Sequence, residues 1–175
     1  MIIDHEGVRY YFDPNRVFSK ECVGNAVHAK PLKKKAKIDM ALACEIAEQV
    51  GSELLEFTAN YTAIIGLHNN TRGGKYSVTS YLRERSDEAQ RVHIVSNKKS
   101  GSTLDDFFIV TNPAHFDRLK DKDEFHVVLT SDQDDGSLSS LCRKKGIPYI
   151  NPEAAFGNVG IQRQMIAEIE DLLKT

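Results

Sequence analysis

The sequence predicts an α/β domain of three layers, α/β/α, around a mostly parallel or mixed central sheet. Short apolar runs alternate with amphipathic stretches along most of the chain, and the last stretch has the apolar stripe of a packed helix. No apolar run approaches the roughly 18 residues that would suggest a membrane span. The length of 175 residues suits one domain, so we expect a single α/β domain over residues 1–175.

The first expected elements follow from hydrophobic spacing. Apolar residues recur at helical intervals over residues 38–50, and Gly51 follows as a stop signal, so a helix is expected there. The short apolar run 61–67 (YTAIIGL) suits a buried strand. The runs 92–95 (VHIV) and 107–110 (FFIV) predict two more strands for the same reason.

The next elements are bounded by recognisable caps and stops. Asn112 is a suitable N-cap for a helix over residues 113–122. A strand is expected at 125–129 (FHVVL), followed by a short helix over 137–145 that ends at Gly146.

The chain closes with a strand at 147–150 and a helix at 160–173. Pro148 has no N–H to donate, which favours a position at the beginning of the strand. In open α/β sheets, ligands bind beyond the carboxyl ends of the strands. Polar residues that directly follow a strand are therefore the candidates for a functional site.

Composition narrows the function classes. Charged residues make up 27% of the chain and the formal net charge is −2, so neither a nucleic-acid nor an anionic-membrane partner is expected. The one dense basic run, Lys30–Lys37 (KPLKKKAK), is interpreted as a solvated loop, with an anion-binding patch as the alternative. The three cysteines form no CxxC pair. The charged N-terminus lacks a signal core, which predicts a cytoplasmic protein.

Two predicted strand ends carry residues able to do chemistry. His68 follows the run 61–67, and imidazole is a common metal ligand and acid–base group, although a His bonded into a loop is the alternative. Asn69 and Asn70 come next, in a polar turn that lines a site or caps the strand. Glu153 follows the last predicted strand. It is interpreted as a general base or a metal ligand, with a Glu at the start of a helix as the alternative.

A third candidate lies near the front of the chain, in the segment 13–18 (DPNRVF). Arg16 has apolar neighbours there, and a desolvated guanidinium needs an anionic partner. That partner is Asp13, Glu153 or a substrate carboxylate. Asn15 precedes Arg16 directly.

The segment DPNRVF, the later LHNNT (67–71) and the late NPE (151–153) occur in an order that resembles zinc-dependent exopeptidases and amidases. In zinc carboxypeptidases an Asn-Arg pair binds the substrate carboxylate, a strand-end His completes the zinc site, and a late Glu is the general base. N-acetylmuramoyl-L-alanine amidases share the fold. The resemblance spans most of the chain and implies a phosphorylase/hydrolase-like architecture.

This resemblance implies a zinc-dependent hydrolase of amide or peptide bonds. Zinc would be held by His68, and Glu153 would take the proton of the attacking water. Asn15 and Arg16 would hold a substrate carboxylate, while Asn69 and Asn70 would orient the substrate or the oxyanion. The implied substrate is a small peptide or a peptidoglycan-type molecule.

The chain departs from the carboxypeptidase pattern in one respect. That pattern begins with a His and a Glu three residues later, and none of the six histidines here has a Glu at that spacing. Three explanations stay open: a missing N-terminal part, an inactive binding domain of the same fold with an incomplete metal site, or an amidase-like ligand set. The last would combine His5, His68 and either Glu21 or its rival Glu6.

Overall fold

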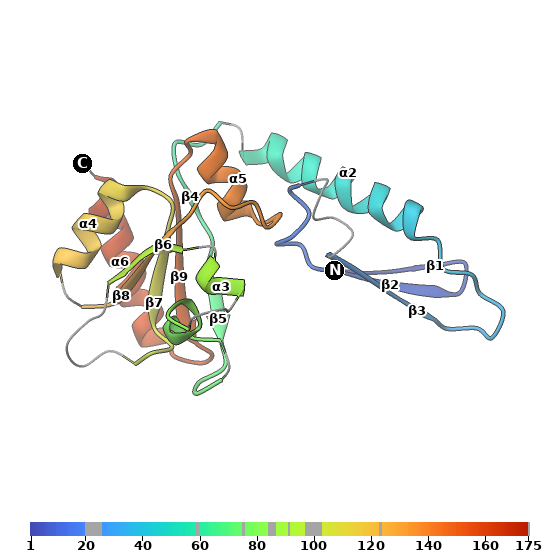
Figure 1. The fold of residues 1–175 in the computed structure, drawn as a ribbon, viewed down its shortest axis with the longest axis horizontal. Helices are drawn as coiled ribbons and strands as arrows, with labels where there is room; N and C mark the ends of the chain where they lie inside the picture. The colour runs from blue at the N-terminus through green and yellow to red at the C-terminus, as the bar shows by residue number, and fades with distance from the viewer. Residues whose placement is uncertain are drawn as a thin grey trace. The chain divides into compact units, whose positions relative to one another are not determined.

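The computed structural model describes residues 1–19, 26–58, 60–74, 76–83, 87–90, 92–96, 103–122 and 124–174. They form a mixed α/β structure with two compact units (Figure 1). The first unit comprises Met1–Tyr61 with Asp134–Leu141, and the second Thr62–Gln133 with Cys142–Thr175. The prediction of one domain of hydrolase type over residues 1–175 stays a prediction. No helix in the described ranges has the length and hydropathy needed to cross a membrane.

The first unit is a three-stranded antiparallel sheet with one long helix. The sheet has the order β1 (Ile2–His5), β2 (Val8–Phe12) and β3 (Val27–Pro31), and the helix is α2 (Met40–Thr58). In β2, Val8, Tyr10 and Phe12 are buried and pack in one cluster with Ala43 and Ala47 of α2. Alternate residues of a strand share a face, so one face of this sheet packs on α2. The predicted elements do not include this sheet.

The prediction that Gly51 ends the first helix is wrong. The helix continues to Thr58, and Gly51 is buried within it. A Cβ atom at Gly51 would lie 2.2 Å from the backbone oxygen of Val17. The glycine therefore permits a close approach between the helix and the segment before β3, rather than a helix end.

The second unit is built on a mixed sheet. Its strands run in the order β4-β9-β7-β8-β6, and β5 pairs with β9 on the same edge as β4. The β7–β8, β4–β9 and β5–β9 pairs are parallel, and the β6–β8 and β7–β9 pairs are antiparallel. The strands are β4 (Ile64–Ile65), β5 (His68–Asn70), β6 (Val92–Ser96), β7 (Phe107–Val110), β8 (His126–Thr130) and β9 (Tyr149–Ala155). The predicted mixed sheet is confirmed in this coarse form.

Three of the helices in this part of the chain, α4, α5 and α6, agree with the predicted ones to within a residue, whereas η1 and α3 are absent from the prediction. They are η1 (Val78–Tyr81), α3 (Asp87–Gln90), α4 (Pro113–Lys122), α5 (Leu138–Lys145) and α6 (Val159–Leu173), with α5 divided between the two units. The predicted strand at 61–67 is replaced by the short β4 and β5 on either side of Gly66 and Leu67.

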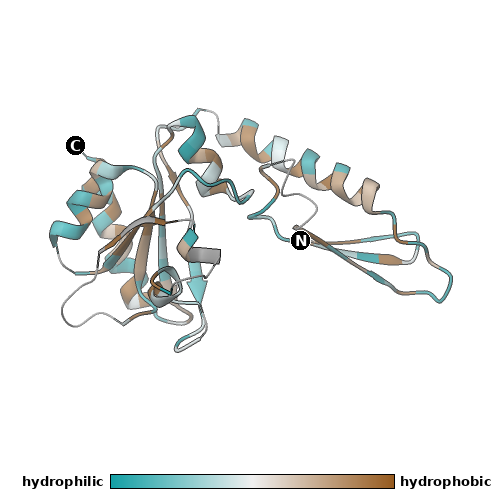
Figure 2. Ribbon diagram, viewed as in Figure 1, coloured by the Kyte–Doolittle hydropathy of each residue, from teal (hydrophilic) through white to brown (hydrophobic). Residues whose placement is uncertain are grey.

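The main apolar core of the second unit lies between the sheet and the helices α4 and α6. Phe108 of β7 meets Phe125 edge to face, with ring centroids 5.4 Å apart, and Met165 and Ile169 of α6 are fully buried in the same cluster. In Figure 1 the two helices lie together beside the sheet, and in Figure 2 the strands β7 and β8 next to them are mostly brown, that is hydrophobic. Removal of these apolar side chains from water stabilises the unit.

Candidate functional site

Strand β9 divides its side chains between the two faces of the sheet. Ile150 and Ala154 pack in the cluster with α6. Asn151 and Glu153 alternate with them, so they lie on the opposite face. Both are almost completely buried, with 4% and 3% of their surface exposed. Glu153 stands inside the strand, not after its end as predicted, and a buried carboxylate inside a central strand needs a partner.

Pro152 explains why the neighbouring edge is broken into β4 and β5. The carbonyl of Ile150 accepts a hydrogen bond from the N–H of Gly66 at 3.0 Å. Two residues later on the same edge stands Pro152, which has no N–H to donate. Pairing resumes at His68, which is in register with Glu153. His68 therefore begins a strand rather than ending one.

The register brings His68 and Glu153 together. The Nδ1 atom of His68 lies 3.5 Å from Oε1 of Glu153, within ion-pair distance when the imidazole is protonated. The same Oε1 atom accepts a hydrogen bond from Nδ2 of Asn151 at 3.1 Å. The His68 side chain is 36% exposed, whereas that of Glu153 is 3% exposed. The pair thus joins a buried carboxylate to an imidazole that solvent can reach.

On the part of this face formed by β5 and β9, three buried acceptor atoms have no hydrogen-bond partner among the described residues. They are Oε2 of Glu153, Oδ1 of Asn151 and Oδ1 of Asn70. A buried acceptor without a partner costs about 1–3 kcal/mol. Because all three atoms are acceptors, a ligand that satisfied them would bring hydrogen-bond donors or a cation.

The two predicted asparagines lie on different faces of the sheet. Asn70 is buried, and its Nδ2 atom donates to the backbone oxygen of Asp105 at 2.6 Å. Asn69 is in register with Ala154 and accepts a 2.6 Å hydrogen bond from Gln162 of α6. Asn70 is therefore a neighbour of the His68–Glu153 pair, while Asn69 faces the α6 side.

Asn15 and Arg16 belong to the first unit, and β5 and β9 belong to the second. The guanidinium of Arg16 lies 3.6 Å from Asp135, a partner that is none of the predicted ones. Its Nη1 atom also donates to the backbone oxygen of Asn15 at 3.0 Å, and Oδ1 of Asn15 accepts a hydrogen bond from Leu138. These contacts give Arg16 a structural ion pair, and its predicted role as a carboxylate anchor stays a prediction.

The described residues do not fit a catalytic zinc ion. Such a zinc takes about three protein ligands and keeps one open position. His68 and Glu153 offer two ligands, and no group of three His, Cys, Asp or Glu side chains that could hold a metal occurs among the described residues. Glu21 of the amidase-like set lies outside the described residues, and His5 belongs to β1 in the first unit.

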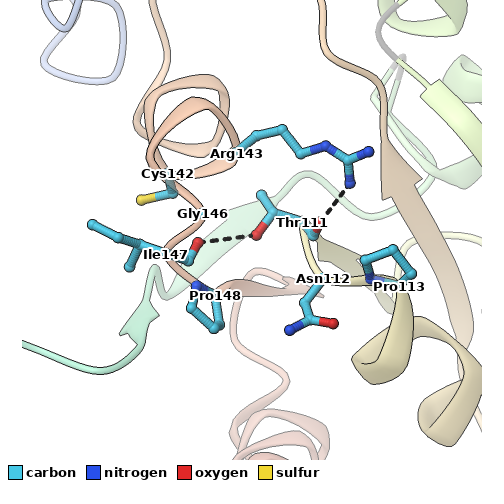
Figure 3. A pocket seen from close by; sticks show the side chains of 8 residues that line it. All are labelled: Thr111, Asn112, Pro113, Cys142, Arg143, Gly146, Ile147 and Pro148. Atoms are coloured by element: carbon cyan, nitrogen blue, oxygen red, sulfur yellow. Dashed lines mark hydrogen bonds between the residues drawn. The ribbon is translucent and has the colours of Figure 1, made fainter.

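A cavity of about 270 Å³ lies at the opposite end of β9, where β7 ends and α4 begins. Figure 3 shows Arg143 reaching across to donate to the backbone oxygen of Thr111. Arg143 also donates to Asp132 at 2.7 Å. The predicted sites do not include this cavity, although the polar Thr111 and Asn112 directly follow the strand 107–110 and fit the strand-end rule.

The thiol of Cys142 lines this cavity. Burial raises the pKa of Cys142 to about 11, an effect that the nearby charge of Lys145 opposes. The side chain therefore stays protonated at neutral pH, and the thiolate is the reactive form. The residues that line the cavity include no acid–base pair like that of His68 and Glu153.

A second hollow, of about 250 Å³, lies between the β4 edge and α6 and is lined mainly by apolar side chains, among them Ile65 and Leu67. Of the three features, only the His68–Glu153 pair combines an ionisable pair with unsatisfied buried atoms. No protein-family model, no curated protein and no solved structure matches the chain.

Proposed function

We propose that this chain is an amide hydrolase, carboxypeptidase- or amidase-like, in which His68 and Glu153 act as one acid–base pair. The substrate class is a small peptide or a peptidoglycan-type molecule that bears a carboxylate. The observation that carries the proposal is the 3.5 Å approach of a solvent-accessible imidazole to a buried carboxylate. In this proposal the second unit has the three-layer α/β/α architecture of a hydrolase, with η1 and its flanking segments opposite α4 and α6.

The difference in exposure assigns the roles. His68 is the group that water and substrate can reach, so it takes the proton of the attacking water while the water oxygen bonds to the amide carbon. When the C–N bond breaks, the imidazolium returns that proton to the leaving amine. Glu153 orients the imidazole through Oε1, which makes it a positioning residue, as the buried carboxylate is in other acid–base pairs.

The unsatisfied oxygens supply the contacts to substrate. Oδ1 of Asn151 and Oδ1 of Asn70 are acceptors without partners, and an amide substrate brings N–H donors. A hydrogen bond to each would fix the amide beside His68, and positioning of this kind accounts for a large share of enzymatic rate enhancement. No step of this scheme uses zinc, because the described residues supply too few ligands for it.

Substitution of His68 tests the proposal. With a panel of short peptides, N-acylated amino acids and peptidoglycan stem peptides, release of free amine by the purified chain should fall by roughly 100-fold or more in His68→Gln, the range expected for loss of a general base. His115→Gln is the matched control, because it changes a histidine of α4. Equal rates in the wild type and His68→Gln would refute the role of His68.

Metal analysis of the same protein tests the zinc-free scheme. We expect activity to survive dialysis against a chelator. Zinc near one per chain, together with loss of activity on its removal, would show that the scheme lacks a metal ligand.

A second candidate is a binding domain of the same fold that does not cleave its ligand. The incomplete ligand set favours it, since a former zinc site would lose ligands before it lost its shape. Calorimetry with the same panel separates the two candidates: saturable binding without amine release supports the binding domain.

A further inference from the structure

In the first unit many of the basic and acidic residues lie in separate segments, although the net charge of the whole chain is close to zero. Residues 26–38 carry five lysines and no acidic residue, whereas α2 carries four glutamates and no Lys or Arg. The lysines are Lys30, Lys33, Lys34, Lys35 and Lys37, and all five are exposed. Figure 2 shows the loop between β3 and α2 as a mostly hydrophilic stretch. A local field of this kind attracts a polyanion whatever the net charge of the whole chain.

The lysine loop, residues 30–37, is held in place at both ends. β1 and β2 are joined by a tight turn in which Glu6 and Gly7 both have positive φ. The oxygen of Gly7 accepts hydrogen bonds from the N–H groups of Leu32 at 2.8 Å and Lys33 at 3.3 Å. Beyond the loop, the N–H of Asp39 donates to the hydroxyl of Tyr10 at 3.1 Å. The lysines are thus presented on fixed backbone, which lowers the entropy lost when they bind a ligand.

The loop continues from an open sheet face. Because Val8, Tyr10 and Phe12 pack on α2, the alternate residues face away from it. The register places Tyr11 beside Ile2 and His28, and Arg9 beside Asp4 and Lys30. This set is mixed polar and basic, with one aromatic ring. Arg9 is held by a bidentate pair with Asp4, at 2.7 and 2.8 Å, so the loop lysines carry the free positive charge of the face.

We propose that the open face of the β1–β3 sheet and the lysine loop form a binding surface for duplex DNA. The lysines would contact phosphates, and the strands carrying Tyr11 and His28 would face the major groove. That groove is about 12 Å wide and admits a β-ribbon, since neighbouring strands are about 4.8 Å apart. The proposal departs from the expectation of no nucleic-acid partner, because that expectation took the charge of the whole chain and not the charge of this surface.

The observations favour a duplex over other polyanions. Single strands are bound largely by stacking on aromatic rings, and the open face offers only Tyr11 among its described residues. Anionic membranes are bound by basic helices with a broad apolar face. Here the basic residues lie on a loop and a strand, and the helix α2 is acidic.

Salt-dependent binding tests the lysine loop. The full chain is titrated against a fluorescein-labelled 20-bp duplex, with anisotropy as the readout, between 50 and 300 mM NaCl. The logarithm of the binding constant should fall linearly with that of the salt concentration, by about 0.9 per phosphate contacted. In Lys33→Gln/Lys34→Gln/Lys35→Gln the slope should lose about 2–3 units and binding at 100 mM salt should weaken by about 10-fold or more.

The matched control removes three charges elsewhere. Lys144→Gln/Lys145→Gln/Lys174→Gln alters exposed lysines of the second unit. It should bind within about 3-fold of the wild type and keep the salt slope. Circular dichroism and the thermal midpoint confirm that each variant is folded. Equal weakening by both triple variants would show attraction to total charge and would overturn the proposed surface.

A second variant tests the sheet face. Tyr11→Ala/His28→Ala should weaken binding several-fold but leave the salt slope unchanged, because groove contacts release no counterions. An unchanged affinity would remove the sheet from the surface. Failure of the wild type to bind the duplex at 50 mM salt would overturn the proposal. Tighter binding to a single strand, or to vesicles with 30% phosphatidylserine, would do the same and would identify the other partner.

Discussion

The two faces of the main sheet differ in what they bury. The buried part of the face toward α4 and α6 is mainly apolar, with rings and branched side chains such as Phe108, Val127 and Ile150 in one cluster. The opposite face is divided. Its β7–β8 side is largely apolar, with Phe107 against the rings of Tyr76 and Tyr81 and in register with the buried His126, and its β9–β5 side holds Asn70, Asn151 and Glu153.

The difference separates residues kept for stability from residues that stability alone does not explain. Buried apolar groups each contribute about 1.5–3 kcal/mol to folding. Buried polar atoms without partners oppose folding, and apolar residues of similar size would fill the β9–β5 side at no such cost. Residues that lower stability and are nevertheless present are candidates for function. The predictions below test this division, from the largest expected effect to the smallest.

Removal of a ring from the apolar face should have the largest effect. Phe108→Ala deletes a fully buried ring that packs edge to face on Phe125. The free energy of unfolding in urea should fall by about 3–5 kcal/mol, from lost transfer energy and the cavity left behind. A loss below about 1 kcal/mol would mean that this face is not the main source of stability.

A medium effect is expected at the edge that carries His68. A Cβ atom at Gly66 would lie 2.2 Å from the hydroxyl oxygen of Tyr149, a side chain that is 2% exposed. Gly66→Ala should therefore cost about 1–3 kcal/mol, as overpacking does in other cores. Gly160→Ala is the control, because a Cβ atom there meets nothing within 4 Å. Equal stability of the two variants would show that β4 tolerates more movement than the close packing implies.

The smallest effect is a pH dependence on the α4 side. Burial, aided by the charge of Arg118, lowers the pKa of His115. A lowered pKa means that the unfolded chain binds the proton more readily, so stability is full above about pH 6.5 and declines as the pH falls toward the folded-state value. In His115→Gln this part of the decline should be absent from urea titrations between pH 7 and 5. An identical pH dependence in both proteins would contradict it.

The sequence predicts the second unit better than the first. The strand at 107–110 and the helix at 113–122 have the predicted bounds, because a buried apolar run and an Asn-Pro start are strong local signals. The β1–β3 sheet is absent from the prediction, although Val8, Tyr10 and Phe12 alternate with polar residues. The end of the first helix is predicted wrongly at Gly51, because this glycine is needed for a close contact with Val17. A contact between residues far apart in the sequence cannot be predicted from the local pattern.

Only part of the candidate site is predicted, because its contacts also depend on which strands pair and which face each residue takes. The family resemblance gives His68 and Glu153 roles in one hydrolase site, and the register of β5 and β9 brings the two side chains together. Asn151 is missed, since a polar residue two positions before Glu153 becomes a partner only when both lie on one strand. Asn69 could not be separated from Asn70 without knowing which face each one takes.

Glu153→Gln tests the central claim most directly, with the free energy of unfolding and the rate of amide release measured on the same protein. The substitution removes a buried charge at nearly constant volume and keeps an oxygen for Asn151. We predict a stability equal to the wild type or higher by up to about 2 kcal/mol, together with a hydrolysis rate lower by at least ~10-fold. A stability loss above about 2 kcal/mol with hydrolysis unchanged would show that Glu153 is structural and would contradict the account.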